Sequence, residues 1–236
     1  MWSGPRNIST AMMRAWGNRD DTAVVDEPLY AHYLKITGKD HPGAAEVVAA
    51  GETDHEKAIE RLLGSVPGGK RVYYQKHMAH HLLPHMDRGW LRRLTNVFLI
   101  REPREVLTSL ARHVPDATLP DTGYPQQAEV FDLVRAWTHR VPLVVDARDV
   151  LENPERILRL LCEALNLPFT DRMLYWPPGP RDTDGVWGKY WYKEVYATTG
   201  FQPYRKKDEP VPDNMKGMLA ECEHHYRHLH AHRLWH

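Results

Sequence analysis

Short apolar runs alternate with longer amphipathic segments along most of this chain. Four runs have the length of a strand and are bounded by turn residues, and they cover residues 22–28, 71–78, 96–101 and 142–146. The clearest is the third, in which Val-Phe-Leu-Ile stand together at residues 97–100. A continuous apolar run is typical of a strand buried on both faces of a parallel sheet.

Segments with helical spacing separate these runs. They cover residues 9–18, 46–63, 103–112 and 126–140, and a further one opens at Asn153. A Ser-Thr pair starts the first and Pro103 stands in the first turn of the third, as helix starts favour. The alternation predicts an α/β fold with a mostly parallel central sheet. Because no internal repeat or low-complexity linker interrupts it, we expect one domain over residues 1–236.

The character of the chain changes after Pro168. Residues 173–192 are crowded with aromatic rings, glycines and prolines. Two interpretations are open. The segment is a flap that its aromatic side chains pack onto the domain, or some of its rings line a pocket for an apolar or ring-bearing molecule.

Composition narrows the function classes. The 236 residues are 42% hydrophobic and 26% charged, which excludes disorder as the main state. Lys+Arg 31 balances Asp+Glu 31, which argues against a nucleic-acid binder driven by bulk positive charge. Two cysteines, Cys162 and Cys222, form no disulfide framework and no thiolate metal site. With no signal peptide or membrane-spanning run in sight, we expect a cytoplasmic protein without a membrane partner.

Residues 4–11, Gly-Pro-Arg-Asn-Ile-Ser-Thr-Ala, form the first candidate for binding chemistry. A loop that enters a helix through Ser9 and Thr10 presents backbone N–H groups, the helix dipole and two hydroxyls to an anion. The Arg6 guanidinium would match phosphate or sulfate oxygens. Alternatively, the two hydroxyl residues simply cap the helix.

The second candidate follows the clearest strand. Arg101 ends that strand, and Ser109 lies on the helix behind it. Ligands of open α/β sheets bind beyond the carboxyl ends of the strands, so both side chains are expected near a ligand's anionic group. A neighbouring carboxylate, Glu102 or Glu105, is the alternative partner of Arg101.

Three motifs together carry a family resemblance. Residues 5–10 resemble the 5′-phosphosulfate loop of sulfotransferases, residues 101–109 are similar to their 3′-phosphate motif, and residues 145–169 resemble their strand and helix before a Leu-Gly-Leu-Pro-like turn. The motifs stand in family order over roughly residues 3–169. More narrowly, the chain looks like a bacterial subgroup that carries Ser-Gly-Pro-Arg-Asn-Ile-Ser-Thr.

The resemblance implies a P-loop NTPase-like three-layer sandwich that uses 3′-phosphoadenylyl sulfate (PAPS) to sulfate a hydroxyl or amine of a small molecule. Residues 3–169 would form the nucleotide-binding core, and residues 170–236 the flap, a basic loop and a C-terminal helix. The implied donor contacts are Arg6, Asn7, Ile8, Ser9 and Thr10 at the 5′-phosphate and Arg101 and Ser109 at the 3′-phosphate. Arg205, Lys206 and Lys207 would close on the phosphates, or else form a solvated charge run.

The same resemblance suggests the groups for transfer. Arg6 and Lys76 would meet the charge that grows on the transferred group, without any metal ion. Glu27, at the end of the strand predicted in the first of the four apolar runs, is the preferred base, and the adjacent Asp26 would raise its pKa. His77 and His80 are the rival bases.

Two departures from the family pattern stand out. Ile8 replaces the loop glycine, and only Met1 and Trp2 remain of the strand that should precede the loop. Either the start of the sequence is misplaced or the edge of the sheet is trimmed. Near the C-terminus, His224, His228 and His232 would share one helix face, where we expect only adventitious metal affinity.

Other functions remain open at this level. A P-loop nucleotide kinase or NTPase is the main alternative, although the Gly-Lys that precedes Ser/Thr in such loops is missing. A catalytically silent nucleotide-binding or interaction module of the same fold is the other. The acceptor and the oligomeric state are left undetermined by the sequence.

Overall fold

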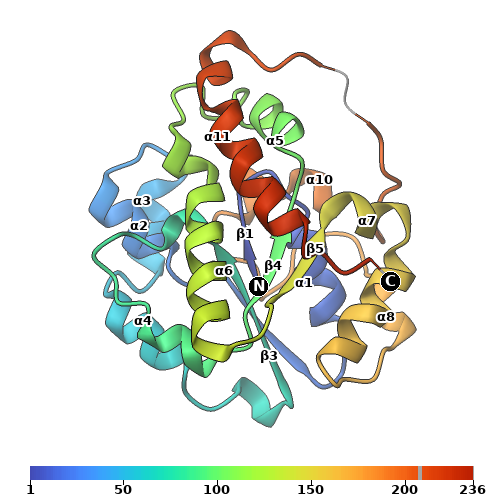
Figure 1. Ribbon diagram of the computed structural model, residues 1–236. Coiled ribbons are helices and arrows are strands. Elements are labelled where there is room, and N and C mark those ends of the chain that lie inside the picture. The colour runs from blue at the N-terminus through green and yellow to red at the C-terminus, as the bar shows by residue number, and fades with distance from the viewer. Residues whose placement is uncertain (207–208, 236) are drawn as a thin grey trace.

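A parallel sheet forms the centre of the computed structural model, which describes residues 1–206 and 209–235 (Figure 1). Its strands are β1 (Trp2–Ser3), β2 (Thr22–Asp26), β3 (Val72–Met78), β4 (Val97–Ile100) and β5 (Leu143–Asp146). They lie in the order β2-β3-β1-β4-β5, and each neighbouring pair is parallel. The predicted parallel sheet is therefore confirmed, and each of the four predicted runs contains a strand.

Helices fill the intervals between the strands. They are α1 (Ser9–Gly17), α2 (Tyr30–Thr37), α3 (Ala44–Ala50), α4 (His55–Leu62), α5 (Pro103–Leu110), α6 (Tyr124–Thr138), α7 (Ala147–Glu152), α8 (Pro154–Ala164), α9 (Gly188–Trp191), α10 (Lys193–Tyr196) and α11 (Asp213–His230). Short 3-10 turns join several of them, including η2 (Ala79–His81) directly after β3.

Strand β4 shows why its sequence is apolar throughout. Phe98 and Ile100 are buried in a core that includes Phe131 of α6 and residues of α11. Val97 and Leu99 are buried in a second core, which includes residues of α1 and α8. Figure 1 shows α6 and α11 in front of the strands. Because side chains alternate between the two faces of a strand, a sheet covered on both sides needs apolar residues at every position of its central strands. The expected three-layer α/β architecture is therefore confirmed.

The shortest strand is central rather than peripheral. Trp2 of β1 is in register with His77 of β3 on one side and with Phe98 of β4 on the other. The expectation of a trimmed sheet edge was therefore wrong. The loop between β1 and α1 consequently starts from the middle of the sheet.

The predicted helix over residues 46–63 was also wrong, because the chain forms two helices there. A Cβ added to Gly51 would lie 2.6 Å from the Cβ of Ala31, so the chain passes close to α2 at this glycine. Asp54 then caps α4, and its side chain accepts hydrogen bonds from two backbone N–H groups. The glycine and the Asp cap together start a new helix.

The C-terminal part of the chain packs back onto the sheet. Trp176 and Trp187 are 3% and 8% exposed, so the aromatic segment is a packed flap. His224 and His228 lie on α11, but His232 comes after the helix ends, and the predicted alignment of three histidines on one face was wrong. Within residues 1–206 and 209–235, none of the helices combines the length and apolar character that a membrane crossing requires.

Candidate functional site

A cavity of about 610 Å³ opens beyond the carboxyl ends of the strands. Residues that directly follow β1, β2 and β4 line it, together with the end of β3. Because all strands are parallel, these ends meet at one edge of the sheet, which is where ligands of open α/β sheets bind. Its volume is typical of a small-molecule site.

The loop after β1 forms one wall of the cavity. Asn7 anchors it, because its Nδ2 donates to the Leu99 carbonyl oxygen at 3.0 Å and its Oδ1 accepts from the Ile8 N–H at 2.8 Å. In this loop Arg6 adopts the left-handed conformation, with φ 55°, whereas Ile8 has a negative φ of −91°. Replacement of the usual glycine by Ile8 is therefore compatible with the backbone that this loop adopts.

Helix α1 points its N-terminus toward the same cavity. Ser9 and Thr10 form the first positions of the helix and line the cavity, and Ile8 occupies the N-cap. Within the described residues no side chain caps this helix, so capping by Ser9 or Thr10, one of the two alternatives, is not what the structure shows. Uncapped N–H groups at a helix N-terminus are a ready binding site for an anion.

Arg6, Arg101 and Ser109 meet at this wall. The Arg6 Nε donates to the Ser109 Oγ at 2.9 Å, and the Arg101 Nη1 donates to the Arg6 carbonyl oxygen at 2.9 Å. Arg101 also pairs with the Glu105 carboxylate at 2.8 Å, one of the two partners considered from the sequence. The two motifs, about a hundred residues apart in the chain, thus contribute to one cationic wall.

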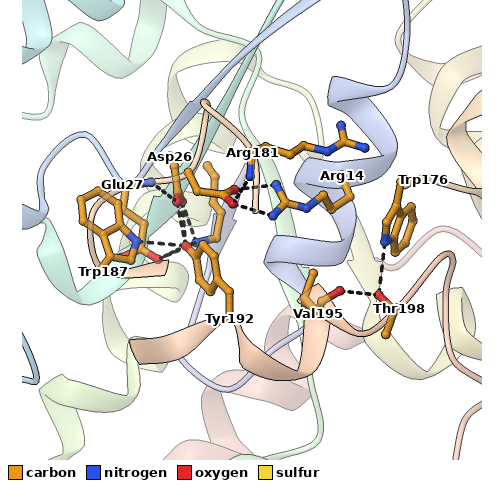
Figure 2. Close-up of polar contacts among 12 residues, drawn as sticks. Arg14, Asp26, Glu27, Trp176, Arg181, Trp187, Tyr192, Val195 and Thr198 are labelled. Carbon is orange, nitrogen blue, oxygen red and sulfur yellow. Dashed lines mark hydrogen bonds and ion pairs between the residues drawn. The ribbon is translucent and has the colours of Figure 1, made fainter. Parts of the chain in front are cut away.

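A buried charge cluster lies on the β2–β3 side of the cavity. The Lys76 Nζ donates to Asp26 at 2.9 Å, to Glu27 at 2.5 Å and to the Tyr192 hydroxyl at 2.7 Å. Figure 2 shows Tyr192 beside both carboxylates. The side chains of Asp26, Lys76 and Glu27 are 1%, 2% and 10% exposed. Glu27, Lys76 and Tyr192 line the cavity, so the flap completes a site that begins on the sheet.

Burial sets the protonation of this cluster. It raises the pKa of Glu27, and repulsion from Asp26 adds to the rise, while Lys76 opposes it. Burial alone would lower the pKa of the Lys76 ammonium, but the attraction of Asp26 and Glu27 outweighs it and the pKa is raised. A carboxylate with a raised pKa beside a cavity is a suitable general base.

The rival histidines are placed differently. His77 is 2% exposed, stacks on Trp2 at 4.3 Å between ring centroids and lies outside the set of cavity-lining residues. Strand alternation explains this, because Lys76 and Met78 face the cavity and the residue between them points the other way. His80 does line the cavity, and burial lowers its pKa to about 3, so it is neutral at neutral pH.

An aromatic wall was missed in the sequence. Tyr30 and Tyr33 of α2 line the cavity, and so does His81, whose ring stacks on Tyr30 at 4.6 Å between centroids. Their spacing of three on a helix just after Glu27 was the available signal. From the flap, Trp191 and Tyr192 also line the cavity, so both interpretations of the aromatic segment apply to different residues.

The basic residues after the flap are only partly described. Arg205 lines the cavity, and Lys206 beside it in the chain is exposed. Lys207 lies outside the described residues. Cys162 and Cys222 are both buried free thiols, and neither lines the cavity.

Comparison with known proteins gives a consistent family. The family described as "Sulfotransferase domain" matches residues 1–232. Two curated proteins of Arabidopsis thaliana, named branched-chain-amino-acid aminotransferase-like proteins 1 and 2, are 36% and 33% identical over 98% of this chain. The chain spans only 41% of the length of each of them, so their names describe much longer proteins.

Among the solved structures compared, one with a TM-score above 0.5 shows a similar fold. The sulfotransferase domain from the Synechococcus PCC 7002 olefin synthase has a TM-score of 0.53, with 15% identity over 93% of this chain and 92% of that chain. The sulfotransferase domain from the curacin biosynthetic pathway has a TM-score of 0.48 and 12% identity, over 94% of this chain and 95% of that chain.

Proposed function

Because this chain belongs to the sulfotransferase domain family, we propose that it transfers a sulfuryl group from PAPS to a hydroxyl or amine of a small molecule. One observation carries the proposal. The cationic wall formed by Arg6 and Arg101 and the buried carboxylate of Glu27 line the same cavity. Anion binding and proton removal can therefore act on one bound pair of molecules.

The donor would lie against the loop after β1. In this proposal the N–H groups at the start of α1, with Ser9 and Thr10, hold the 5′-phosphate, and Asn7 and Ile8 shape the loop around it. Arg101 and Ser109 hold the 3′-phosphate, and Arg205, with Lys206 next to it, closes over the nucleotide. The hydrogen bond from Arg6 to Ser109 supports this assignment, because it keeps the two anchors within one ligand's reach.

Transfer requires a base that takes the acceptor's proton and positive charge near the transferred group. We assign the base to Glu27, whose raised pKa suits it to take a proton from the acceptor. Lys76 and Arg6 stabilise the charge that develops as the sulfuryl group moves. His80 stays as the second candidate base because it lines the cavity. This scheme needs no metal ion.

The acceptor would occupy the aromatic side of the cavity. Tyr30, Tyr33 and Trp191 line that side, and ring faces favour an apolar or aromatic molecule that carries the hydroxyl or amine. The two buried free thiols are consistent with the cytoplasmic location that we propose.

Thermal stability with two nucleotides distinguishes the main alternatives. We expect 3′,5′-adenosine bisphosphate to raise the melting temperature of the chain and Mg-ATP to leave it unchanged. A rise with Mg-ATP alone would favour the nucleotide kinase or NTPase instead. In Arg6→Ala, affinity for the bisphosphate should fall at least about tenfold, since a charge-assisted contact contributes about 1.5–3 kcal/mol. Unchanged affinity would reject the loop assignment.

Catalysis is tested separately from binding. Wild-type protein should release the bisphosphate from PAPS in the presence of a panel of phenols and amines. Glu27→Gln should lose about 10²–10⁴-fold in turnover while it keeps its affinity for the bisphosphate. Glu152→Gln serves as a control, because Glu152 pairs with Arg148 on the surface and does not line the cavity. A wild type that binds the bisphosphate but turns over none of the panel would support the silent-module alternative.

A further inference from the structure

Three histidines, one buried, one half-buried and one exposed, meet outside the cavity. His32 lies on α2, His55 opens α4 and His85 lies in the segment after η2. One ring nitrogen of each lies within 4.8 Å of the others, and none of the three residues lines the cavity. We propose that this histidine triad binds one divalent transition-metal ion, with Zn²⁺ as the best fit, and thereby ties three segments of the fold together.

The spacing of the nitrogens suits a shared ion. The Nε2 atoms of His32 and His85 are 3.1 Å apart. Two imidazole nitrogens on one tetrahedral zinc ion, each about 2.0–2.1 Å from the metal, lie about 3.3 Å apart. The ring of His55 lies 4.6 Å from that of His32 and 5.3 Å from that of His85, between centroids. Small rotations of the half-buried His55 ring and the exposed His85 ring would therefore complete a three-nitrogen set.

The tautomer of His32 is fixed in the form that a metal needs. Its Nδ1 lies 2.9 Å from the Thr53 carbonyl oxygen. A carbonyl oxygen only accepts, so Nδ1 carries the proton and the Nε2 of the neutral ring presents its lone pair to the triad. A metal-ligating histidine commonly donates its second nitrogen to a backbone carbonyl in this way.

The hydrogen bonding of the triad without a metal is incomplete. His85 can donate its Nε2–H to the Nε2 of His32, so these two nitrogens can satisfy each other. Within the described residues, His55 makes ring contacts with both partners but no hydrogen bond to either. A single ion would use the lone pairs of all three rings at once.

The type of ligand indicates the type of ion. Three neutral imidazoles suit Zn²⁺, Ni²⁺ or Cu²⁺, whereas Mg²⁺ and Ca²⁺ prefer oxygen ligands. Of the two carboxylates that flank His55 in the chain, Asp54 already caps α4 and Glu56 is exposed. Because His85 is exposed, the fourth coordination position would be open to water.

The segments that the ion would join also form the aromatic side of the cavity. Helix α2 carries Tyr30 and Tyr33, and η2 carries His80 and His81, all of which line the cavity. The triad lies on α2 and shortly after η2, with α4 as the third support. A bound ion would therefore stiffen this wall without contacting any molecule inside it, which makes it a structural site. This inference is independent of the proposed reaction.

Metal titration of the whole chain tests the proposal. Tag-free protein, stripped with a chelator, is titrated with Co²⁺ in the visible range and with Zn²⁺ by calorimetry. We expect one tight site per chain, with Co²⁺ bands that Zn²⁺ abolishes. His85→Ala should fold normally because the side chain is exposed, and it should weaken this site at least about tenfold. His55→Ala should behave in the same way.

The histidine-rich α11 provides the matched control. The double variant His224→Ala/His228→Ala removes the same chemistry from elsewhere in the chain and should keep the tight site. Zinc in about hundredfold excess over Kd should raise the melting temperature of wild type and of this control by about 5 °C or more, but not that of His85→Ala. If the tight site disappears in the α11 variant and survives in His85→Ala, or if wild type shows no tight site, the proposal is wrong.

Discussion

Arg14 of α1 and Asp184 of the flap form a buried ion pair whose loss should loosen the flap. Arg14 donates from Nη1 and Nη2 to the two carboxylate oxygens at 2.5 and 2.7 Å, and the side chains are 1% and 4% exposed (Figure 2). The Arg181 N–H donates to the same carboxylate at 2.8 Å. Arg14→Met would leave the Asp184 carboxylate buried, with this backbone N–H, the Tyr196 hydroxyl and the more distant Arg181 charge as its remaining partners.

The expected magnitude follows from that burial. Breaking a buried pair by removal of one partner costs about 3–5 kcal/mol, because the remaining charge is uncompensated. For a chain of this size, the melting temperature should fall by about 6–20 °C. The double variant Arg14→Met/Asp184→Leu should recover most of the loss, since it buries no lone charge.

Urea denaturation of the two single variants and the double variant measures this coupling. Exchange of amide hydrogens in α9 and α10 should also rise in Arg14→Met if the pair holds the flap. The control is Lys216→Met, which breaks the pair with Asp213 on α11, where the side chains are 61% and 93% exposed. That exposed pair contributes about 0.3–0.5 kcal/mol. If Arg14→Met cost no more than this control, the flap would be held by its aromatic packing and the reasoning above would be refuted.

Two further predictions concern pH and backbone space. Burial lowers the pKa of His77 and His81 well below 6.5 and that of His80 to about 3. Below pH 6.5 the unfolded chain therefore binds protons at these histidines, whereas the folded chain does not. Each histidine should then lower the free energy of unfolding by about 1.4 kcal/mol per pH unit on acidification. Urea midpoints that stay constant down to about pH 5 would contradict this prediction. Gly4→Ala should lower the melting temperature, because its Cβ would lie 2.6 Å from the backbone carbonyl oxygen of Thr122. Gly217 is exposed on α11, and a Cβ added there would have no neighbouring atom within 4 Å, so Gly217→Ala should stabilise the fold by about 0.5–1 kcal/mol. Equal shifts in the two glycine variants would mean that the contact at Gly4 relaxes freely.

Local hydrophobic patterns in the sequence determined that a parallel sheet lies between two layers of helices. An uninterrupted apolar run such as that of β4 requires cover on both faces, and strands that alternate with amphipathic helices require a parallel sheet. The position of Arg101 at the end of that run placed it at the ligand-binding edge, because strand ends and chain order are both visible in a sequence. The motifs indicated the family because their order along the chain can also be read directly from the sequence.

Tertiary structure alone decided which side chains meet. Tyr192 reaches Lys76 across more than a hundred residues, and the pairing of β1 with β3 and β4 makes a strand of two residues central. His32, His55 and His85 come together only because the fold brings α2, the start of α4 and the segment after η2 to one place. Periodicity encodes which face of an element is buried, but it carries no information on which distant element covers that face. The cationic wall was therefore predictable in outline, whereas the aromatic wall and the histidine triad were not.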